Sequence, residues 1–330
     1  MTLYYNHSTH SFLGRYYSEK NEYRLVKCSS IVLFFLKIVL ESHTKLRYDK
    51  HRTQGGSIMK ILTFNTHSLE EANMPQKQKQ FVQALKQLDP DIVALQEVNQ
   101  TNTSPIVSHT PSTIQIIHKT IPVREDNHVL ALDTLLKKEG LSYEIVWSPV
   151  KLGYGKYDEG LAFLSKKPIQ NIETILLSKQ DNYSDFRTRK ALKIQTEDGV
   201  FVNVHMGWWN DELEPFQDQF IRLDQSIHQE DPLYLMGDFN AEASIPNEGY
   251  AQVVKSGYSD LYTLAQQKDD GISVDHVIDG WRNNQNISGM RIDYIFSNKK
   301  RNVPWIRTAF RSQEEPILSD HFGVLACLTD

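Results

Sequence analysis

Short apolar runs alternate with amphipathic segments along residues 59–330, and this alternation restricts the chain to a layered fold of strands and helices. Phe81, Leu85 and Leu88 follow helical spacing, so residues 75–88 are predicted to form an amphipathic helix. The other predicted helices cover 130–138 and 216–227, and the predicted strands cover 60–67, 92–98, 143–150, 160–165, 190–196, 200–205, 233–236, 292–297 and 323–328.

Hairpin signals occur among the strand–helix units. Glu197-Asp198-Gly199 separates two strand-like runs and has the composition of a hairpin turn. Hairpins mixed with strand–helix units favour two packed sheets with helices outside them. We therefore expect one α/β (α+β) domain over residues 59–330.

The first 58 residues differ from the rest. They hold nine Lys and Arg against four Asp and Glu and show no sustained strand or helix period. The apolar run at 31–40 is shorter than the roughly 20 residues of a membrane-spanning helix, and no small-x-small cleavage site follows it. Gln54-Gly55-Gly56 can be encoded by a bacterial ribosome-binding sequence, with Met59 as the start. We expect residues 1–58 to be a leader that is disordered or not part of the native protein; export or a membrane anchor is the alternative.

Composition excludes several classes of protein. Only two cysteines are present, Cys28 and Cys327, which excludes a disulfide scaffold and a Cys-based zinc cluster. Residues 59–330 hold 27 Lys and Arg against 37 Asp and Glu. An acidic body argues against broad, non-specific binding to a nucleic acid backbone.

Acids, amides and imidazoles stand at the ends of several predicted strands. Taken singly, each has an ordinary structural explanation, such as an Asx turn or a hydrogen-bonded carboxylate. Together, several acids on apolar strands would repel one another unless a cation lay between them. Strand ends at one edge of a layered α/β fold are also where ligands bind. The residues concerned are Asn65, Glu97, His205, Asp238, Asn240, Asp293, Asp320 and His321.

Six short motifs carry a family resemblance. The order FNTH, LQEV, NVH, GDFN, RIDYIF and SDHFGV resembles the endonuclease/exonuclease/phosphatase superfamily, which includes DNase I-like nucleases, inositol polyphosphate phosphatases and bacterial sphingomyelinases. The resemblance spans residues 59–330. It implies a DNase I-like, four-layer α/β/β/α sandwich and hydrolysis of a phosphate ester with a divalent metal.

The same resemblance implies roles for individual residues. Asn65, Glu97 and Asp320 are expected at the metal, and oxygen ligands without Cys suit Mg²⁺ or Mn²⁺. The expected catalytic residues are Asp238, which would accept a proton from water, Asn240 and His205, which would face the phosphate, and His321 and Asp293. Either Asp293 or Asp320 could orient an imidazole, and the sequence leaves that choice open.

Segments outside these motifs bear on the substrate. Residues 153–162, 186–190, 208–209 and 280–284 resemble the maltose 6'-phosphate phosphatase group of this family. This narrower resemblance implies a cytoplasmic enzyme that takes the phosphate from a phosphorylated disaccharide. Its partner would be the small sugar phosphate, with no nucleic acid, membrane or obligate protein partner.

Six residues in these segments are expected to bind that substrate. Arg187 and Arg189 suit bidentate contact with phosphate. Trp208, Trp209 and Trp281 offer flat faces to sugar rings, and Glu159 could bind sugar hydroxyls. The alternatives are a metal-dependent nuclease, a sphingomyelinase-like phosphodiesterase and a non-catalytic binding module on the same fold.

Overall fold

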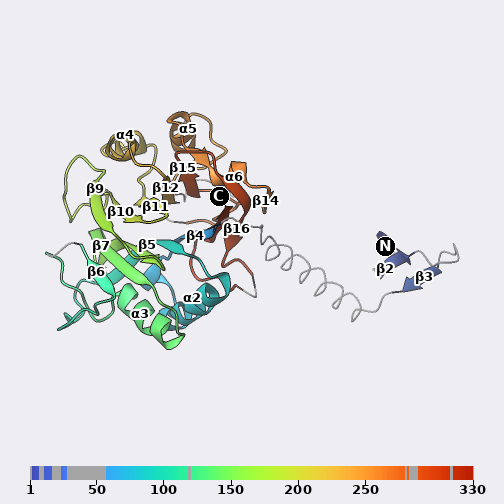
Figure 1. Ribbon diagram of the computed structural model, residues 1–330, viewed down its shortest axis with the longest axis horizontal. Helices are drawn as coiled ribbons and strands as arrows, with labels where there is room; N and C mark the ends of the chain where they lie inside the picture. The colour runs from blue at the N-terminus through green and yellow to red at the C-terminus, as the bar shows by residue number, and fades with distance from the viewer. Residues whose placement is uncertain are drawn as a thin grey trace. The chain divides into compact units, whose positions relative to one another are not determined.

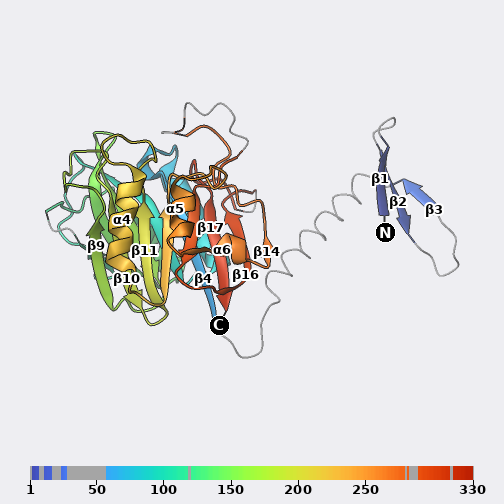
Figure 2. The ribbon, with the colours of Figure 1, turned by 90° about the horizontal axis from the view of Figure 1, so that it is seen from above.

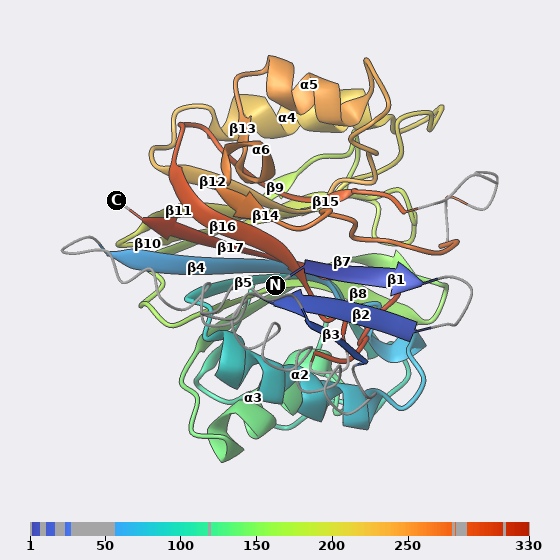
Figure 3. The same cartoon turned by 90° about the vertical axis from the view of Figure 1, so that its right-hand side faces the viewer.

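The structure is a computed structural model that describes residues 57–329, apart from 118–119, 279–280, 282–288 and 313–314, and three short strands nearer the N-terminus. Within the main part, two β-sheets pack face to face and helices cover both outer faces (Figure 1). The predicted four-layer α/β/β/α sandwich is confirmed. Figure 3 shows the layers edge-on, with α4 and α5 on one outside and α2 and α3 on the other.

The larger sheet has eight strands in mixed orientation. Its middle pair, β4 and β5, is parallel, and β5 then pairs antiparallel with β8. In spatial order the sheet consists of β14 (Gln267–Lys268), β16 (Asn302–Ala309), β17 (Gly323–Thr329), β4 (Ile58–Asn65), β5 (Ile92–Thr101), β8 (Tyr157–Ser165), β7 (Glu144–Gly153) and β6 (Ile114–Ile116).

The smaller sheet has six strands. β11 and β12 run parallel, and their other neighbours run antiparallel to them. In spatial order the sheet consists of β13 (Ser259–Asp260), β15 (Asp293–Ser297), β12 (Leu233–Asp238), β11 (Gly199–His205), β10 (Lys190–Thr196) and β9 (Asn171–Leu176).

The helices bury one face each against the sheets. Figure 2 shows α4 and α5 on the outer face of the smaller sheet, where Phe216, Phe220 and Leu223 of α4 join its buried cluster. On the other side, Phe81 and Leu85 of α2 are buried. The helices are η1 (Ser68–Glu70), α2 (Met74–Leu88), α3 (His128–Lys138), α4 (Phe216–Ile227), α5 (Gly249–Lys255) and α6 (Leu261–Leu264).

The space between the sheets is apolar with one polar bridge. Phe163 and Phe201 belong to the cluster that fills it. Within it, the Asn203 side-chain amide donates to the carbonyl oxygens of Leu95 (2.8 Å) and Ala162 (2.9 Å), and Gln96 Nε2 donates to Asn203 Oδ1 at 2.7 Å. This bridge ties β11 of the smaller sheet to β5 and β8 of the larger one.

The predicted helices and strands over 59–330 are all present, with ends that differ by a few residues. Several elements were not predicted, and β16 is the longest of them. Pro304 lies within β16 and argues against a strand, because proline lacks the N–H that a sheet needs. The structure accommodates it at a shift in register between Asn302 and Trp305.

The chain divides into two compact units, Met1–Gly55 and Gly56–Asp330. The described backbone of the first unit is an antiparallel sheet of β1 (Thr2–Asn6), β2 (Ser11–Tyr16) and β3 (Arg24–Lys27), whereas the sequence predicted no regular element here. The apolar run at 31–40 lies outside the described residues. Among the described residues, none of the helices has the length and apolar character needed to cross a membrane.

Strand polarity gathers the candidate residues at one end of the sandwich. Strands β4, β11 and β12 carry them at their carboxyl ends, β5 carries Glu97 at a break in its register just past its middle, and the antiparallel strands β8 and β15 carry them near their starts. In the smaller sheet, His205 pairs with Asp238 and Asp238 pairs with Asp293 in one register row. Residues far apart in sequence therefore lie side by side.

Candidate active site

Asp238, the last residue of β12, is the centre of the site and is almost fully buried. Its Oδ1 accepts a hydrogen bond from the Asn240 backbone N–H at 2.8 Å, and its Oδ2 accepts one from Asn65 Nδ2 at 3.1 Å. The Nε2 atoms of His205 and His321 lie 3.7 and 3.8 Å from Oδ2. One carboxylate thus faces an amide and two imidazoles.

Gly237 allows β12 to deliver Asp238 to this place. Its φ of +145° is rarely adopted by residues with a side chain. A Cβ atom here would also lie 2.0 Å from the Val204 carbonyl oxygen on the neighbouring strand. Glycine is therefore required by both the backbone conformation and the close approach of β11.

Glu97 is directed into the site by a β-bulge. The register of β5 against β8 shifts between Leu95 and Val98, and Glu97 has a φ of +52°. Positive φ is uncommon for a residue other than glycine and carries strain that the surrounding sheet must hold. Bulges re-aim side chains in this way next to active sites. The Asn65 side-chain amide donates to Glu97 Oε1 at 3.0 Å, so it links Glu97 to Asp238.

His321 and Asp293 form a buried pair behind Asp238. His321 Nδ1 lies 2.8 Å from Asp293 Oδ2, and both side chains are almost fully enclosed. Burial lowers the pKa of His321, but Asp293 and Asp238 outweigh that effect and raise the pKa well above its usual value. The structure thus pairs His321 with Asp293, whereas Asp320 contacts Ser319 and lies 3.7 Å from His67.

The pKa values of Asp238 and His205 shift in opposite directions. Burial, followed by the charge of Asp293, raises the pKa of Asp238 to about 6. Burial also lowers the pKa of His205 well below its usual value, with Arg189 and Lys151 adding to the effect. A carboxylate that can still ionise near neutral pH therefore lies beside a neutral imidazole.

The carboxylates suit a divalent cation. Glu97 Oε2 is buried and has no hydrogen-bond partner among the described residues. Burial, Glu159 and Asp320 together raise the pKa of Glu97 to about 7, as expected where negative charges lack a cation between them. Asp320 lines the same pocket, and carboxylate oxygens are the ligands that Mg²⁺ or Mn²⁺ prefers. Among the residues that the structure describes, two clusters meet the spacing of metal ligands: His67, Glu71 and Asp320, and Asp238, Asp293 and His321.

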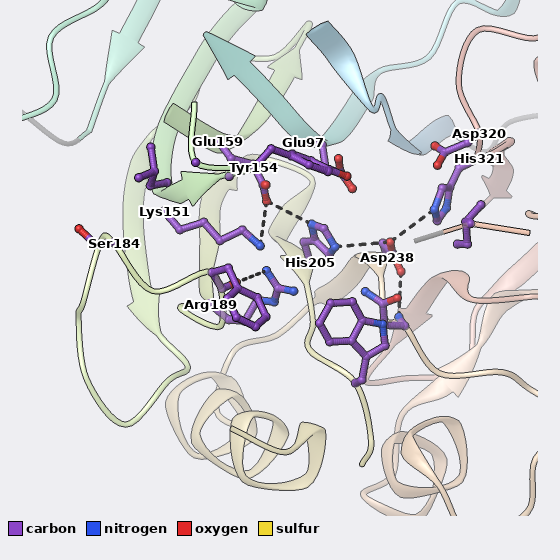
Figure 4. Close-up of a pocket in the computed structure, with 17 residues that line it drawn as sticks. Glu97, Lys151, Tyr154, Glu159, Ser184, Arg189, His205, Asp238, Asp320 and His321 are labelled. Atoms are coloured by element: carbon purple, nitrogen blue, oxygen red, sulfur yellow. Dashed lines mark hydrogen bonds and ion pairs between the residues drawn. The ribbon is translucent and has the colours of Figure 1, made fainter. Parts of the chain in front are cut away.

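These groups open into one pocket of about 490 Å³ (Figure 4). Polar atoms gather in its floor, and Tyr154, Phe186 and Trp208 contribute aromatic walls. Tyr154 and Phe186 are 46% and 48% exposed, and the Arg187 guanidinium lies 4.3 Å from the Phe186 ring centroid. Nine of the predicted site residues line it: Glu97, Glu159, Arg189, His205, Trp208, Asp238, Asn240, Asp320 and His321.

A second polar group occupies the pocket wall away from Asp238. Lys151 Nζ lies 3.2 Å from Glu159 Oε1, and the same oxygen is 3.7 Å from His205 Nδ1. The Arg189 guanidinium lies 5.8 Å from the Trp208 ring centroid. Figure 4 shows Lys151, Glu159 and Arg189 on one side of His205, with Asp238, Asp320 and His321 on the other.

Five predicted residues do not line the pocket. Asn65 and Asp293 support it from behind through the contacts described above. Arg187 pairs with Asp211 at 3.2 Å, Trp209 packs beside Phe216, and Trp281 donates to Asn240 Oδ1 at 3.3 Å. In the segment 280–284, Trp281 alone is among the described residues.

The pocket also contains residues that the sequence analysis did not assign to it. Tyr154 and Phe186 fall within segments set apart by their sequence, but they were not named as ligand contacts. Ser184 precedes one of those segments by two residues. Lys151 offered the clearest missed signal, because a lysine in an otherwise apolar strand is almost never buried without a partner.

Comparison with known proteins agrees with this geometry. The sequence profile of the Endonuclease/Exonuclease/phosphatase family matches residues 62–321. A family protein of the same description from Leptotrichia buccalis is 30% identical, with a TM-score of 0.70 over 82% of this chain and 99% of its own. No curated protein matches the chain.

Two more distant structures share the fold. A conserved protein of unknown function from Enterococcus faecalis is 20% identical, with a TM-score of 0.57 over 81% of this chain and 98% of its own. A 3' phosphatase from Neisseria, solved with a product DNA hairpin, is also 20% identical, with a TM-score of 0.53 over the same shares.

Proposed function

This chain belongs to the endonuclease/exonuclease/phosphatase family, which includes metal-dependent nucleases and phosphatases, and we propose that it removes phosphate from a phosphorylated disaccharide. Maltose 6'-phosphate is the first candidate, and the products would be the free sugar and inorganic phosphate. The proposal places the reaction in the cytoplasm, where a phosphorylated sugar would be met.

One observation carries the proposal: Asp238, Asn240, His205 and His321 line a single pocket of about 490 Å³ to which Tyr154, Phe186 and Trp208 also contribute side chains. A small ester can enter such a pocket, and sugar rings pack well against aromatic faces. A duplex-cutting enzyme instead needs rows of Lys and Arg along an extended surface. The acidic composition of residues 59–330 supports the smaller substrate.

The proposed reaction uses a cation held by Glu97 and Asp320, which would polarise the phosphoryl oxygens and offset charge on the leaving alkoxide. Asn65, expected from the sequence as a ligand, would instead orient Glu97 through its amide N–H. Asp238 would accept the proton of the attacking water, since its two oxygens are fixed by Asn240 and Asn65. Family members are metal-dependent hydrolases, and the burial of Glu97 Oε2 without a partner among the described residues supports such a cation here.

The remaining polar residues would stabilise the phosphate. His321, kept protonated by Asp293, can donate from Nε2 to a non-bridging oxygen. The neutral His205 can donate one hydrogen bond. Asn240 uses one amide N–H on the Met206 carbonyl and accepts from Trp281, which fixes its plane and leaves one N–H for substrate.

Phosphate release from a panel of substrates tests the proposal. The panel contains maltose 6'-phosphate, trehalose 6-phosphate, glucose 6-phosphate, a DNA 3'-phosphate, duplex DNA and sphingomyelin, each with Mg²⁺ or Mn²⁺. We expect the disaccharide phosphates to give the highest kcat/KM and EDTA to abolish turnover. Preference for DNA or for sphingomyelin would replace the sugar proposal with a nuclease or a phosphodiesterase.

Asp238→Asn serves as the inactive control in that panel. The amide keeps the size of the side chain but cannot accept the proton, so we expect kcat to fall by roughly 10²–10⁴. Its thermal unfolding should remain cooperative, and Asp218→Asn, at a half-buried position on α4 outside the pocket, should retain full activity. Near-normal turnover by Asp238→Asn would show that another group takes the proton.

A further inference from the structure

Two cations, Lys151 and Arg189, are buried in the wall of the pocket. Lys151 lies near the end of β7 and is 6% exposed, and Arg189 immediately precedes β10 and is 2% exposed. Both line the same pocket as Asp238 and His321. Lysine and arginine are almost never buried to this extent unless they are paired.

The pairing within the chain is incomplete. Glu159 lies 3.2 Å from Lys151 and is the carboxylate in reach of that amine. Arg189 has no carboxylate within salt-bridge distance among the described residues. Its Nη1 makes a long contact of 3.5 Å with the Phe186 carbonyl oxygen, and its buried Nε has no partner in the same part of the chain. Among the described residues, Glu159 is thus the one carboxylate in direct contact with this pair of cations, whereas Asp238 and Glu97 act on Arg189 from a greater distance.

A buried guanidinium without an anion is costly, because it has lost its water and gained little in exchange. The electrostatics show that the two cations repel each other, although Glu159 and Glu97 offset part of that effect at Lys151. Burial lowers the pKa of Lys151, and Arg189 lowers it further. Both cations also lower the pKa of His205, and all three residues line the same pocket. The wall is therefore built to receive an anion.

We infer that Lys151 and Arg189 select phosphate monoesters over phosphate diesters by neutralising the second negative charge of the monoester. The inference rests on the proposed phosphatase function. It identifies Lys151 and Arg189 as the groups that distinguish a monoester from a diester. At neutral pH a monoester carries close to two negative charges and three terminal oxygens. The Arg189 fork suits two such oxygens, and Lys151 adds a point charge.

A diester presents a different group to the same wall. It carries one negative charge, and its second ester substituent replaces a terminal oxygen. That substituent would cover the cations without compensating their charge, so the full cost of burying Arg189 would remain. The enzyme then disfavours the diester because the charges of Lys151 and Arg189 stay uncompensated in that complex. The diester does not have to clash with the wall for this selection to occur.

Two chromogenic esters test the inference without any sugar. The value of kcat/KM is measured for p-nitrophenyl phosphate and bis(p-nitrophenyl) phosphate, at about pH 8, above the second phosphate pKa of about 6. We expect the wild type to prefer the monoester. In Arg189→Met and in Lys151→Met, the ratio of kcat/KM for the monoester to kcat/KM for the diester should fall by about 10–100-fold. This is the range expected for the loss of a hydrogen bond to a charged group.

The matched control is Lys193→Met. Lys193 is also a largely buried lysine, on β10, but it is paired with Glu173 at 2.7 Å and Glu230 at 2.8 Å outside the pocket. Its ratio should equal that of the wild type. Lys151→Met leaves the buried Glu159 carboxylate without its partner, which could unfold the protein. In that case the double variant Lys151→Met/Glu159→Gln removes both charges and is measured in its place.

Inorganic phosphate provides a second readout. Its inhibition constant is measured with the diester as the substrate. For Arg189→Met this constant should rise by a factor similar to the fall in the ratio of kcat/KM between monoester and diester. Equal losses on both esters, unchanged inhibition by phosphate, or a wild type that prefers the diester would each overturn the inference. Because neither ester contains a sugar, selection between them can hold even if the disaccharide proposal fails.

Discussion

Glu97 and Asp293 are both buried carboxylates, yet their surroundings give them different uses. Asp293 holds His321 at 2.8 Å and keeps that imidazole protonated. Glu97 accepts from Asn65 through one oxygen and leaves the other without a partner in the described part of the chain. At this scale the informative feature is a buried polar atom without a partner among the described residues. A bound cation would satisfy Glu97 Oε2, and a bound anion would satisfy Arg189 Nε.

His128 gives a prediction about pH at the same scale. It is the first residue of α3, its Nδ1 lies 2.8 Å from Ser68 Oγ, and burial lowers its pKa to about 3. The unfolded chain binds this proton below a pH of about 6.5, whereas the folded chain does not until about pH 3. The free energy of unfolding should therefore fall as the pH drops through that window.

Urea unfolding of the wild type and His128→Gln measures this effect. Glutamine keeps an amide near Ser68 but does not titrate. Between pH 6 and pH 4, the wild type should lose about 1.4 kcal/mol per pH unit more than the variant. Carboxylates titrate equally in both proteins and cancel in the difference. Parallel curves would mean that His128 becomes protonated without unfolding.

At the scale of elements, irregular positions in two strands deliver the catalytic side chains. A bulge in β5 turns Glu97 into the pocket, and Gly237 lets β12 pass close to β11 before Asp238. Both positions have positive φ. Regular strands would send alternate side chains to opposite faces, so these departures place Glu97 and Asp238 together.

Gly237→Ala tests this close approach. The new Cβ would meet the Val204 carbonyl oxygen and would also strain the backbone. We expect a loss of roughly 2–6 kcal/mol in the free energy of unfolding. Gly257→Ala is the control, since Gly257 also has positive φ but a Cβ atom added there would meet no other atom within 4 Å.

The control should lose only about 1–2 kcal/mol, the cost of the backbone conformation alone. Urea unfolding of both variants gives the comparison. Equal losses would mean that β11 moves aside to admit the methyl group, and that Gly237 is required only for its φ.

At the scale of the molecule, the site exists because two sheets are fixed against each other. Asn65 comes from the larger sheet and Asp238 from the smaller, and their 3.1 Å hydrogen bond crosses between the sheets. Deeper in the same interface, Asn203 bridges to Gln96, the residue before Glu97. This polar bridge sets the register of one sheet on the other, which an apolar interface alone specifies poorly.

Asn203→Leu tests the bridge. The change removes three hydrogen bonds, one from Gln96 Nε2 and two to carbonyl oxygens, while Gln96 Nε2 keeps its bond to Thr63 Oγ1. Each buried group left unpaired costs about 1–3 kcal/mol. We expect lower stability in urea and a lower kcat, because Glu97 adjoins Gln96. Met236→Leu, at the paired position on β12, should cost less than about 1.5 kcal/mol. Normal kcat in Asn203→Leu would show that the bridge does not position Glu97.

Local pattern in the sequence predicted much of the fold. Helical spacing located α2 and α4, and apolar runs located β5, β11 and β12. Polar residues at strand ends predicted most of the pocket floor, because strand direction is a local property and the ends of parallel strands meet at one edge. The pattern could not predict β16, whose proline is tolerated only through a shift in register with β17.

The tertiary structure decided which side chains meet. The sequence determined the chemical groups: oxygen ligands, two imidazoles and several cations. It did not separate Arg189, buried in the pocket, from Arg187, paired with Asp211, although the two lie two residues apart. Nor did it reveal Lys151, whose contact with Glu159 depends on the pairing of β7 with β8. Local spacing determines secondary structure, whereas burial and charge pairing depend on contacts between distant segments, which only the packed sheets create.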